Sequence, residues 1–181
     1  MLAIYAPYVL NTTATFEYTP PEEGEFLRRY RAVTAQFPWL VWEEENVVLG
    51  YAYASTPYTR EAYAWCAEPT VYLRPEARGR GIGRALYTAL ETFLTWQGYI
   101  VLYALVCDEN RDSCRFHEKQ GYHVAAHFPR CGFKFGRWVG LFWMEKRLKT
   151  VEIPSDKPTP WSSIMQNAEN APDILDTLSL S

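Results

Sequence analysis

The chain has 181 residues, of which 48% are hydrophobic and 22% charged, as in ordinary globular proteins. Its length argues for one domain, and its formal net charge of −3 disfavours a nucleic-acid binder driven by bulk positive charge. No apolar run approaches the ~20 residues of a membrane-spanning helix, and the apolar N-terminal stretch lacks the basic residues of a signal peptide. We therefore expect a cytoplasmic protein with no nucleic-acid partner and no membrane partner.

The first part of the chain predicts two helices and then three strands. Pro7 is expected to kink or end the first helix, and a tight turn at Glu45 and Asn46 is expected to join the first two strands. Pro69 cannot donate to a strand ladder, so it predicts a bulge or a splayed edge. The expected elements are helices over Leu2–Val9 and from Glu22 to Gln36, and strands over Trp39–Glu43, Val47–Ser55 and Ala62–Leu73.

The second part of the chain begins with a turn rich in glycine and arginine, Arg74–Gly83. Apolar residues at helical spacing follow it, and Gly98 is expected to end that helix. A continuous apolar run then indicates a strand buried on both faces. The expected elements are helices over Arg84–Gln97 and Arg111–Gln120, and strands over Ile100–Val106, Tyr122–Phe128 and Trp138–Arg147. This order predicts an α/β domain around a mixed sheet.

The composition changes near Thr150. Residues 150–181 contain one basic and five acidic residues, four prolines and many small polar residues. We therefore expect residues 1–149 to form the folded domain and residues 150–181 to form a mobile acidic appendage. The apolar residues between Ile174 and Leu180 could dock on a partner or on a neighbouring subunit.

The cysteines and histidines do not suggest a metal site. There is no C-x-x-C pair, and the three histidines form no ligand pattern with the cysteines. We expect no metal and four free thiols in a reducing compartment. These thiols belong to Cys66, Cys107, Cys114 and Cys131.

The glycine-rich turn carries the strongest chemical signal. It follows the apolar stretch Val71–Leu73 and ends at the start of a helix. Glycines there allow backbone N–H groups to approach an anion, and the helix N-terminus adds a partial positive charge. The turn is neither a Walker A loop nor a dinucleotide fingerprint, because no Gly-Lys-Ser/Thr follows and the glycines are spaced G-x-G-x-G. A phosphate site and an ordinary turn with solvated arginines both remain open.

The run Arg78–Gly83 resembles the pyrophosphate loop of the GNAT family of N-acetyltransferases, which bind acetyl-coenzyme A. Further segments, in the family's order and spacing, are similar to its phosphinothricin acetyltransferase-like branch. They are Thr15–Glu17, Arg60–Tyr63, Glu68–Tyr72, Asn110–Glu118 and Gly132–Trp138. The resemblance covers about Leu2 to Leu148. It implies a mixed, mostly antiparallel sheet flanked by helices, a homodimer, and acetyl transfer to a small amino-acid-like amine.

The resemblance also assigns roles to residues. It places the general base at Glu68 and a general acid or partner of the coenzyme A thiolate at His117. A solvent-exposed glutamate at a strand end and a structural histidine in the core remain the alternatives for these two residues. Phe16, Glu17, Arg60 and Tyr63 correspond to positions near the acceptor. Arg60 could bind a carboxylate or a phosphinate. The residues expected to contact the cofactor are Val71, Tyr72, Leu73, Arg78, Gly79, Arg80, Gly81, Ile82, Gly83, Arg84 and Asn110.

Two features depart from the family pattern. The chain begins in the first helix, so the usual first strand is expected to be missing. Gly140 also stands where relatives often have an acidic residue. These departures give weight to a module without catalysis, and two other functions stay open. One is acetylation of a peptide or protein N-terminus, and the other is binding of coenzyme A without catalysis.

Overall fold

The computed structural model describes residues 1–150, 153–154 and 156–168. The sheet has six strands in the order β1-β2-β3-β4-β6-β5. Only β3 and β4 are parallel, and all other neighbours are antiparallel. The strands are β1 (Trp39–Glu44), β2 (Val47–Ser55), β3 (Cys66–Leu73), β4 (Val101–Cys107), β5 (His123–Lys134) and β6 (Arg137–Arg147).

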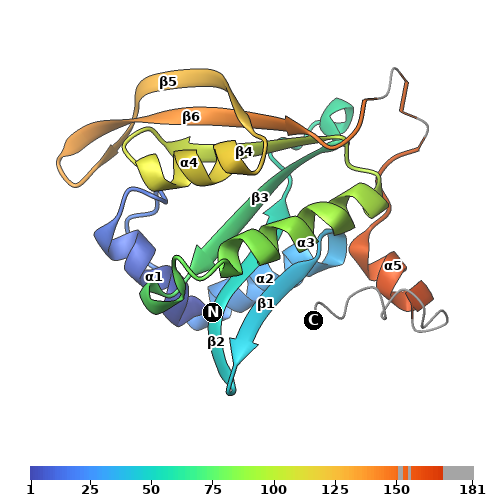
Figure 1. The fold of residues 1–181 in the computed structure, drawn as a ribbon, viewed down its shortest axis with the longest axis horizontal. Coiled ribbons are helices and arrows are strands. Elements are labelled where there is room, and N and C mark those ends of the chain that lie inside the picture. Colours follow the sequence, from blue (N-terminus) through green and yellow to red (C-terminus); the bar gives the residue numbers. More distant parts are fainter. Residues whose placement is uncertain (151–152, 155, 169–181) are drawn as a thin grey trace.

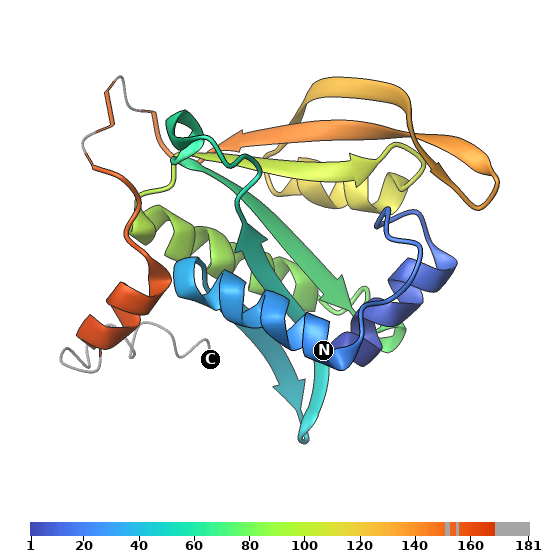
Figure 2. The ribbon, with the colours of Figure 1, turned by 180° about the vertical axis from the view of Figure 1, so that it is seen from behind.

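Helices cover both faces of this sheet. In Figure 1, α3 and α4 lie in front of the sheet, while Figure 2 shows α1 and α2 on the opposite face. The helices are α1 (Leu2–Asn11), α2 (Glu23–Gln36), α3 (Ile82–Gln97), α4 (Arg111–Lys119) and α5 (Trp161–Ala168). The predicted mixed, mostly antiparallel α/β fold is confirmed, and no strand precedes α1 in the described residues.

The α3 helix supplies much of the core. Leu86, Leu90 and Leu94 recur at helical spacing, and each is at most 5% exposed. The helix ends as predicted at Gly98, which adopts a left-handed conformation (φ 102°). This packing fixes the start of α3, and with it the glycine-rich turn, against the sheet.

Several predicted boundaries were wrong. The first helix does not stop at Pro7 but continues to Asn11, because Val9 is fully buried and anchors its last turn. The stretch before Cys66 is a short 3-10 helix and a turn, not a strand. The β5 strand runs past Phe128 to Lys134, with irregular pairing after Phe128 that sequence periodicity does not show.

The described part of the C-terminal region packs on the domain, where a mobile appendage was expected. The Trp161 ring contacts Phe93 of α3 at 5.0 Å between centroids, and Ser162 Oγ donates to the Ala35 carbonyl of α2 at 2.9 Å. Gln97 of α3 donates to the Thr159 carbonyl at 2.8 Å. Figure 2 shows α5 beside α2 and α3. The apolar residues expected to dock, 174–180, lie outside the described residues.

Candidate active site

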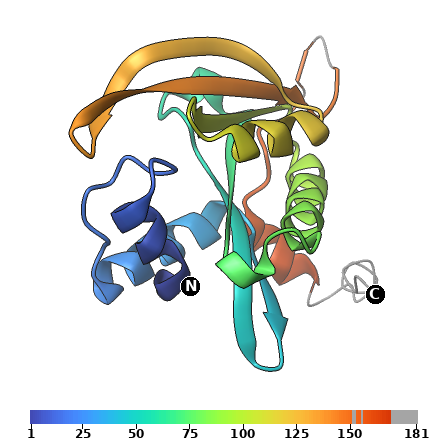
Figure 3. The same cartoon turned by 60° about the vertical axis from the view of Figure 1, so that its left-hand side comes forward.

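A cleft opens where β3 and β4 separate. The two parallel strands pair only at Cys66 with Val101 and at Ala67 with Leu102. They then diverge, next to Pro69. The register between β3 and β2 continues through Pro69 without a shift, so the proline produces the splayed edge that was one of its two predicted outcomes. Figure 3 shows the two strands diverging.

The cleft has a volume of about 1030 Å³ and lies between α1, the separated strands and α4. Most of the residues predicted to contact the cofactor line it, namely Val71, Tyr72, Leu73, Arg78, Gly79, Gly81, Gly83, Arg84 and Asn110. Ile82 is instead buried in the core, and Arg80 forms an ion pair with Glu44 of β1 at 2.8 Å. Arg80 is therefore bound to a carboxylate, while Arg78 and Arg84 line the cleft.

The glycine-rich turn has the geometry of an anion site. Gly79 (φ 73°) and Gly81 (φ 83°) adopt left-handed conformations that favour glycine. Gly81 is the N-cap of α3 and offers no capping side chain, so the first amides of the helix remain available to a bound anion. The turn, two arginines and an open strand edge fit a ligand that carries a pyrophosphate and an extended amide-containing arm.

Tyr8 was not recognised from the sequence, although it lines the cleft. Its hydroxyl donates to the Leu73 carbonyl at 2.7 Å and accepts from the Leu73 amide at 3.3 Å. The Arg78 guanidinium lies 5.3 Å from the centre of the Tyr8 ring. Tyr8 therefore joins α1 to the end of β3 and to the glycine-rich turn. As one aromatic residue in an apolar helix, it gave no signal of this contact.

Glu68 lies at the point of strand separation and lines the cleft. No hydrogen bond or ion pair joins its carboxylate to another described residue. Burial raises the pKa of Glu68 above its ordinary value. A carboxylate in this position is available to accept a proton from a ligand.

His117 lines the same cleft from α4 and is only 7% exposed. Its Nδ1 lies 2.8 Å from the Ser113 carbonyl oxygen, which can only accept, so Nδ1 carries a hydrogen. Its Nε2 lies 2.9 Å from the Tyr87 hydroxyl. Burial lowers the pKa of His117, partly offset by the bond to Ser113. The ring is therefore mainly neutral at neutral pH. Asn110 caps the same helix, accepting from the Ser113 amide at 3.1 Å.

The four residues predicted near the acceptor are spread over different surroundings, and none lines the large cleft. Phe16 packs on Gly132, where an added Cβ would lie 2.4 Å from its ring. Glu17 pairs with Arg29 at 2.6 Å beside a smaller cavity. Tyr63 contacts the Tyr58 ring, while the Arg60 side chain has no partner among the described residues.

The structure explains why Gly140 lacks a side chain. A Cβ there would lie 2.1 Å from Asp108 Oδ2. The Asp108 carboxylate accepts from the Gly140 amide at 3.2 Å and pairs with His127 Nε2 at 2.9 Å. The carboxylate of Asp108, one residue beyond β4, thus occupies the space that a side chain at position 140 would need.

No cluster of metal-binding side chains occurs in the described parts of the chain. None of the helices described there is long and apolar enough to cross a membrane. All four cysteines are free thiols.

Comparisons with known proteins agree with this geometry. Residues 7–122 match the Acetyltransferase (GNAT) family. A phosphinothricin N-acetyltransferase of Alcaligenes faecalis is 38% identical over 148 residues, 81% of this chain and 75% of that protein. An L-methionine sulfoximine/L-methionine sulfone acetyltransferase of Salmonella typhimurium is 34% identical over 152 residues, 83% of this chain and 89% of that protein.

Comparison with a solved structure also indicates a GNAT acetyltransferase. The phosphinothricin acetyltransferase of Sinorhizobium meliloti in complex with acetyl-CoA superposes with a TM-score of 0.83 at 36% identity, covering 89% of each chain. The residues around the cleft fit this thioester as the acetyl donor. The chain belongs to the GNAT family and is an acetyl-CoA-dependent N-acetyltransferase of the phosphinothricin and methionine sulfoximine branch.

Proposed function

We propose that this enzyme acetylates the primary amine of a small amino-acid-like acceptor by direct attack on the thioester. The observation that carries this proposal is the Glu68 carboxylate, which has no partner in the described part of the chain and lies where β3 and β4 separate. An alkyl amine has an ordinary pKa of ~10.4 and is protonated at neutral pH, so a base must act before the attack. Glu68 accepts this proton, directly or through one water, and burial makes it a stronger base.

The strand edge and the glycine-rich turn are proposed to hold acetyl-CoA. The Val71–Leu73 backbone pairs with the pantetheine arm, and an amide of this edge stabilises the oxyanion that develops on the thioester carbonyl. The amides at the start of α3, with Arg78 and Arg84, bind the pyrophosphate. The bond from Tyr8 to the Leu73 backbone opens when the pantetheine takes this edge.

His117 is proposed to serve the leaving thiolate. Its Nδ1–H, now bonded to the Ser113 carbonyl, turns to the sulfur as negative charge develops there. Arg60, which has no partner among the described residues, binds the carboxylate of the acceptor.

Thiol release from acetyl-CoA tests this function. The acceptors are amino acids, methionine sulfone and sulfoximine, phosphinothricin, polyamines and short peptides. We expect turnover with small amino-acid-like acceptors, a large loss of turnover in Glu68→Gln, and unchanged coenzyme A binding by calorimetry. Binding with no turnover for any amine would favour a coenzyme A-binding module. Turnover with peptides alone would favour an N-terminal acetyltransferase.

Assembly and location are also proposed. We expect a homodimer in the cytoplasm, where free thiols such as Cys131 persist. Exposed aromatic side chains on the β5–β6 hairpin, Phe128, Phe133 and Trp138, would suit a subunit interface. Light scattering on the purified protein gives the mass of the assembly.

A further inference from the structure

A second cavity, of about 230 Å³, lies beside Glu68 on the sheet face covered by α1 and α2. In the register of β2 and β3, Ser55 is opposite Glu68 and Tyr53 is opposite Thr70. Directly opposed residues have Cβ atoms about 5 Å apart on one face of a sheet. Ser55 and Tyr53 line this cavity, so it adjoins the proposed base. A group held at Glu68 can therefore extend a side chain into it.

The cavity has an aromatic wall. The Trp39 ring stacks on Tyr53 (centroids 4.2 Å apart, 6° between planes) and on Tyr51 (5.5 Å, 12°). Phe26 makes a T-shaped contact with Trp39 and also lines the cavity. Such a wall favours an apolar body in the ligand.

The Tyr51 hydroxyl indicates that a ligand of this cavity also carries a polar atom. Its side chain is only 1% exposed, yet no hydrogen bond joins its hydroxyl to another described residue. Tyr53, next to it in the cavity, also has no hydrogen-bond partner for its hydroxyl there. Both hydroxyls line the cavity, so they are available to donate to a ligand atom that accepts hydrogen bonds.

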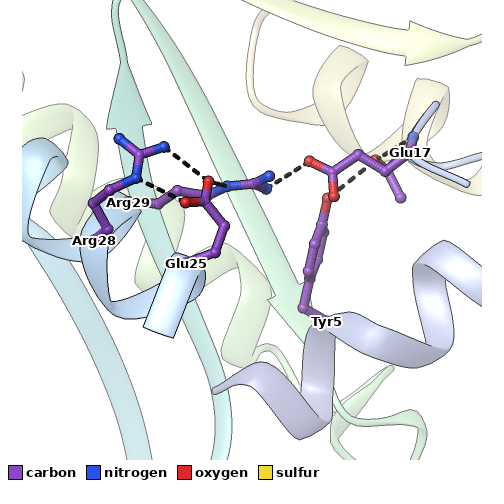
Figure 4. Close-up of polar contacts among 6 residues, drawn as sticks. Tyr5, Glu17, Glu25, Arg28 and Arg29 are labelled. Atoms are coloured by element: carbon purple, nitrogen blue, oxygen red, sulfur yellow. Dashed lines mark hydrogen bonds and ion pairs between the residues drawn. The ribbon is translucent and has the colours of Figure 1, made fainter. Parts of the chain in front are cut away.

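The charges of the cavity are already paired. Its lining contains two charged residues, Glu17 and Arg29, which pair at 2.6 Å. Arg29 also pairs with Glu25 at 2.8 Å, and Glu25 pairs with Arg28 at 2.7 Å. Figure 4 shows this chain of ion pairs from α2 to the loop after α1. No cation in it is left to balance an anionic side chain, and Arg60 lies outside the cavity lining.

We propose that this cavity receives the side chain of the acceptor and selects a neutral one, with an apolar body and a hydrogen-bond acceptor, over an anionic one. This inference rests on the proposed function of Glu68. Methionine sulfone and phosphinothricin are a matched pair, since a neutral methylsulfonyl group in one replaces a methylphosphinate anion in the other. The structure therefore assigns the enzyme to sulfone-type acceptors.

The test compares kcat/KM for the two acceptors by thiol release. We expect at least a tenfold preference for methionine sulfone, and equal or better use of phosphinothricin would overturn the proposal. Glu25→Gln frees Arg29 from one carboxylate and should shift the ratio at least threefold towards phosphinothricin. Glu23→Gln makes the same charge change on the same helix, at a residue that forms no ion pair with Arg29, and should leave the ratio unchanged.

A second variant tests the hydroxyl donor. Tyr51→Phe should lower kcat/KM for methionine sulfone at least fivefold and change that for norleucine little, since norleucine has no acceptor atom. Tyr30→Phe is the control, because Tyr30 also packs on Trp39 but does not line the cavity. A loss that is equal for both acceptors would contradict the assignment.

Failure of the proposed function would look different. In that case no amine would release thiol, and calorimetric binding of the two acceptors to the coenzyme A complex would still be measured. Binding of methionine sulfone at least tenfold tighter than phosphinothricin would support the cavity even then. Binding of neither acceptor, or tighter binding of phosphinothricin, would refute it.

Discussion

The Tyr87 hydroxyl lies 2.9 Å from His117 Nε2, while the Nδ1 of the same ring is bonded to the Ser113 carbonyl. Because that carbonyl cannot donate, the neutral ring carries its hydrogen on Nδ1, and Nε2 can accept from Tyr87, whose hydroxyl also has the Pro69 carbonyl oxygen as an acceptor at 3.2 Å. The contact joins α3 to α4 beneath the cleft. It leaves the His117 ring in one orientation, with both nitrogens bonded before any ligand is present.

The depressed pKa of His117 should appear in the pH dependence of stability. Burial keeps the ring neutral in the folded protein, whereas the unfolded chain binds a proton below about pH 6.5. The free energy of unfolding should therefore fall as pH drops below 6.5, by about 1.4 kcal/mol for each pH unit between the two pKa values. Urea denaturation between pH 5 and 8 measures this slope. The slope should be lost in His117→Gln and kept in His123→Gln, an exposed control.

Glu68 should lower stability at the pH at which it acts. Its pKa is raised by burial, so its carboxylate is harder to ionise in the folded protein than in the unfolded chain. The protonated Glu68 side chain therefore favours the folded state at low pH, and this stability is lost as pH rises through the pKa that Glu68 has in the folded protein. Glu68→Gln should therefore unfold at a higher temperature than wild type at pH 8, although it is inactive, and the difference should vanish near pH 4.

The exposed Glu118→Gln variant is the control for this comparison. Calorimetric scans at the two pH values give the result. A Glu68→Gln protein less stable than wild type at pH 8 would show that the carboxylate makes a favourable contact and is not a base without a partner.

Gly81→Ala tests the anion site through the backbone. An added Cβ at Gly81 meets no atom within 4 Å, so space is available, but the left-handed conformation (φ 83°) costs a non-glycine residue roughly 1–2 kcal/mol. Relaxing this strain rotates the amides at the start of α3. We expect acetyl-CoA binding to weaken about tenfold by calorimetry. Gly24→Ala, in open space on α2 without positive φ, should leave binding unchanged.

The parts of the site that depend on local sequence patterns could be predicted from the sequence. A strand, a glycine turn and an apolar helix in succession give the anion site, because each has its own pattern. Pro69 predicted a bulge or a splayed edge, of which the structure shows the splayed edge, since a missing N–H is a property of one residue. The boundaries that failed depend on distant packing, as when buried Val9 extends α1 past Pro7.

Contacts between distant segments could not be read from the sequence. Tyr8 and Leu73 are 65 positions apart, and nothing local to either one indicates their hydrogen bonds. Arg80 looked like a third arginine for the anion, but β1 offers it Glu44. The smaller cavity likewise depends on the stacking of Trp39 on Tyr53, which the β1–β2 register creates.

Gly140 and Asp108 should behave as one unit. A methyl group at position 140 would lie 2.1 Å from Asp108 Oδ2 and 3.1 Å from His127 Nε2, so Gly140→Ala must displace a carboxylate held by two hydrogen bonds. We expect it to lower the free energy of unfolding by about 1–3 kcal/mol. In an Asp108→Ala background the space is empty, so the same substitution should cost much less.

Urea denaturation of wild type, the two single variants and the double variant completes a double-mutant cycle for Gly140 and Asp108. A coupling energy of about 0.5–3 kcal/mol is expected for residues in such contact. Additive losses would mean that the carboxylate can move aside freely. In that case Asp108 would not be the reason for a glycine at position 140. An acidic residue there should then be accepted without loss of stability. A coupled pair, by contrast, means that Asp108 already occupies the space, so Gly140→Asp should be more destabilising than Gly140→Ala.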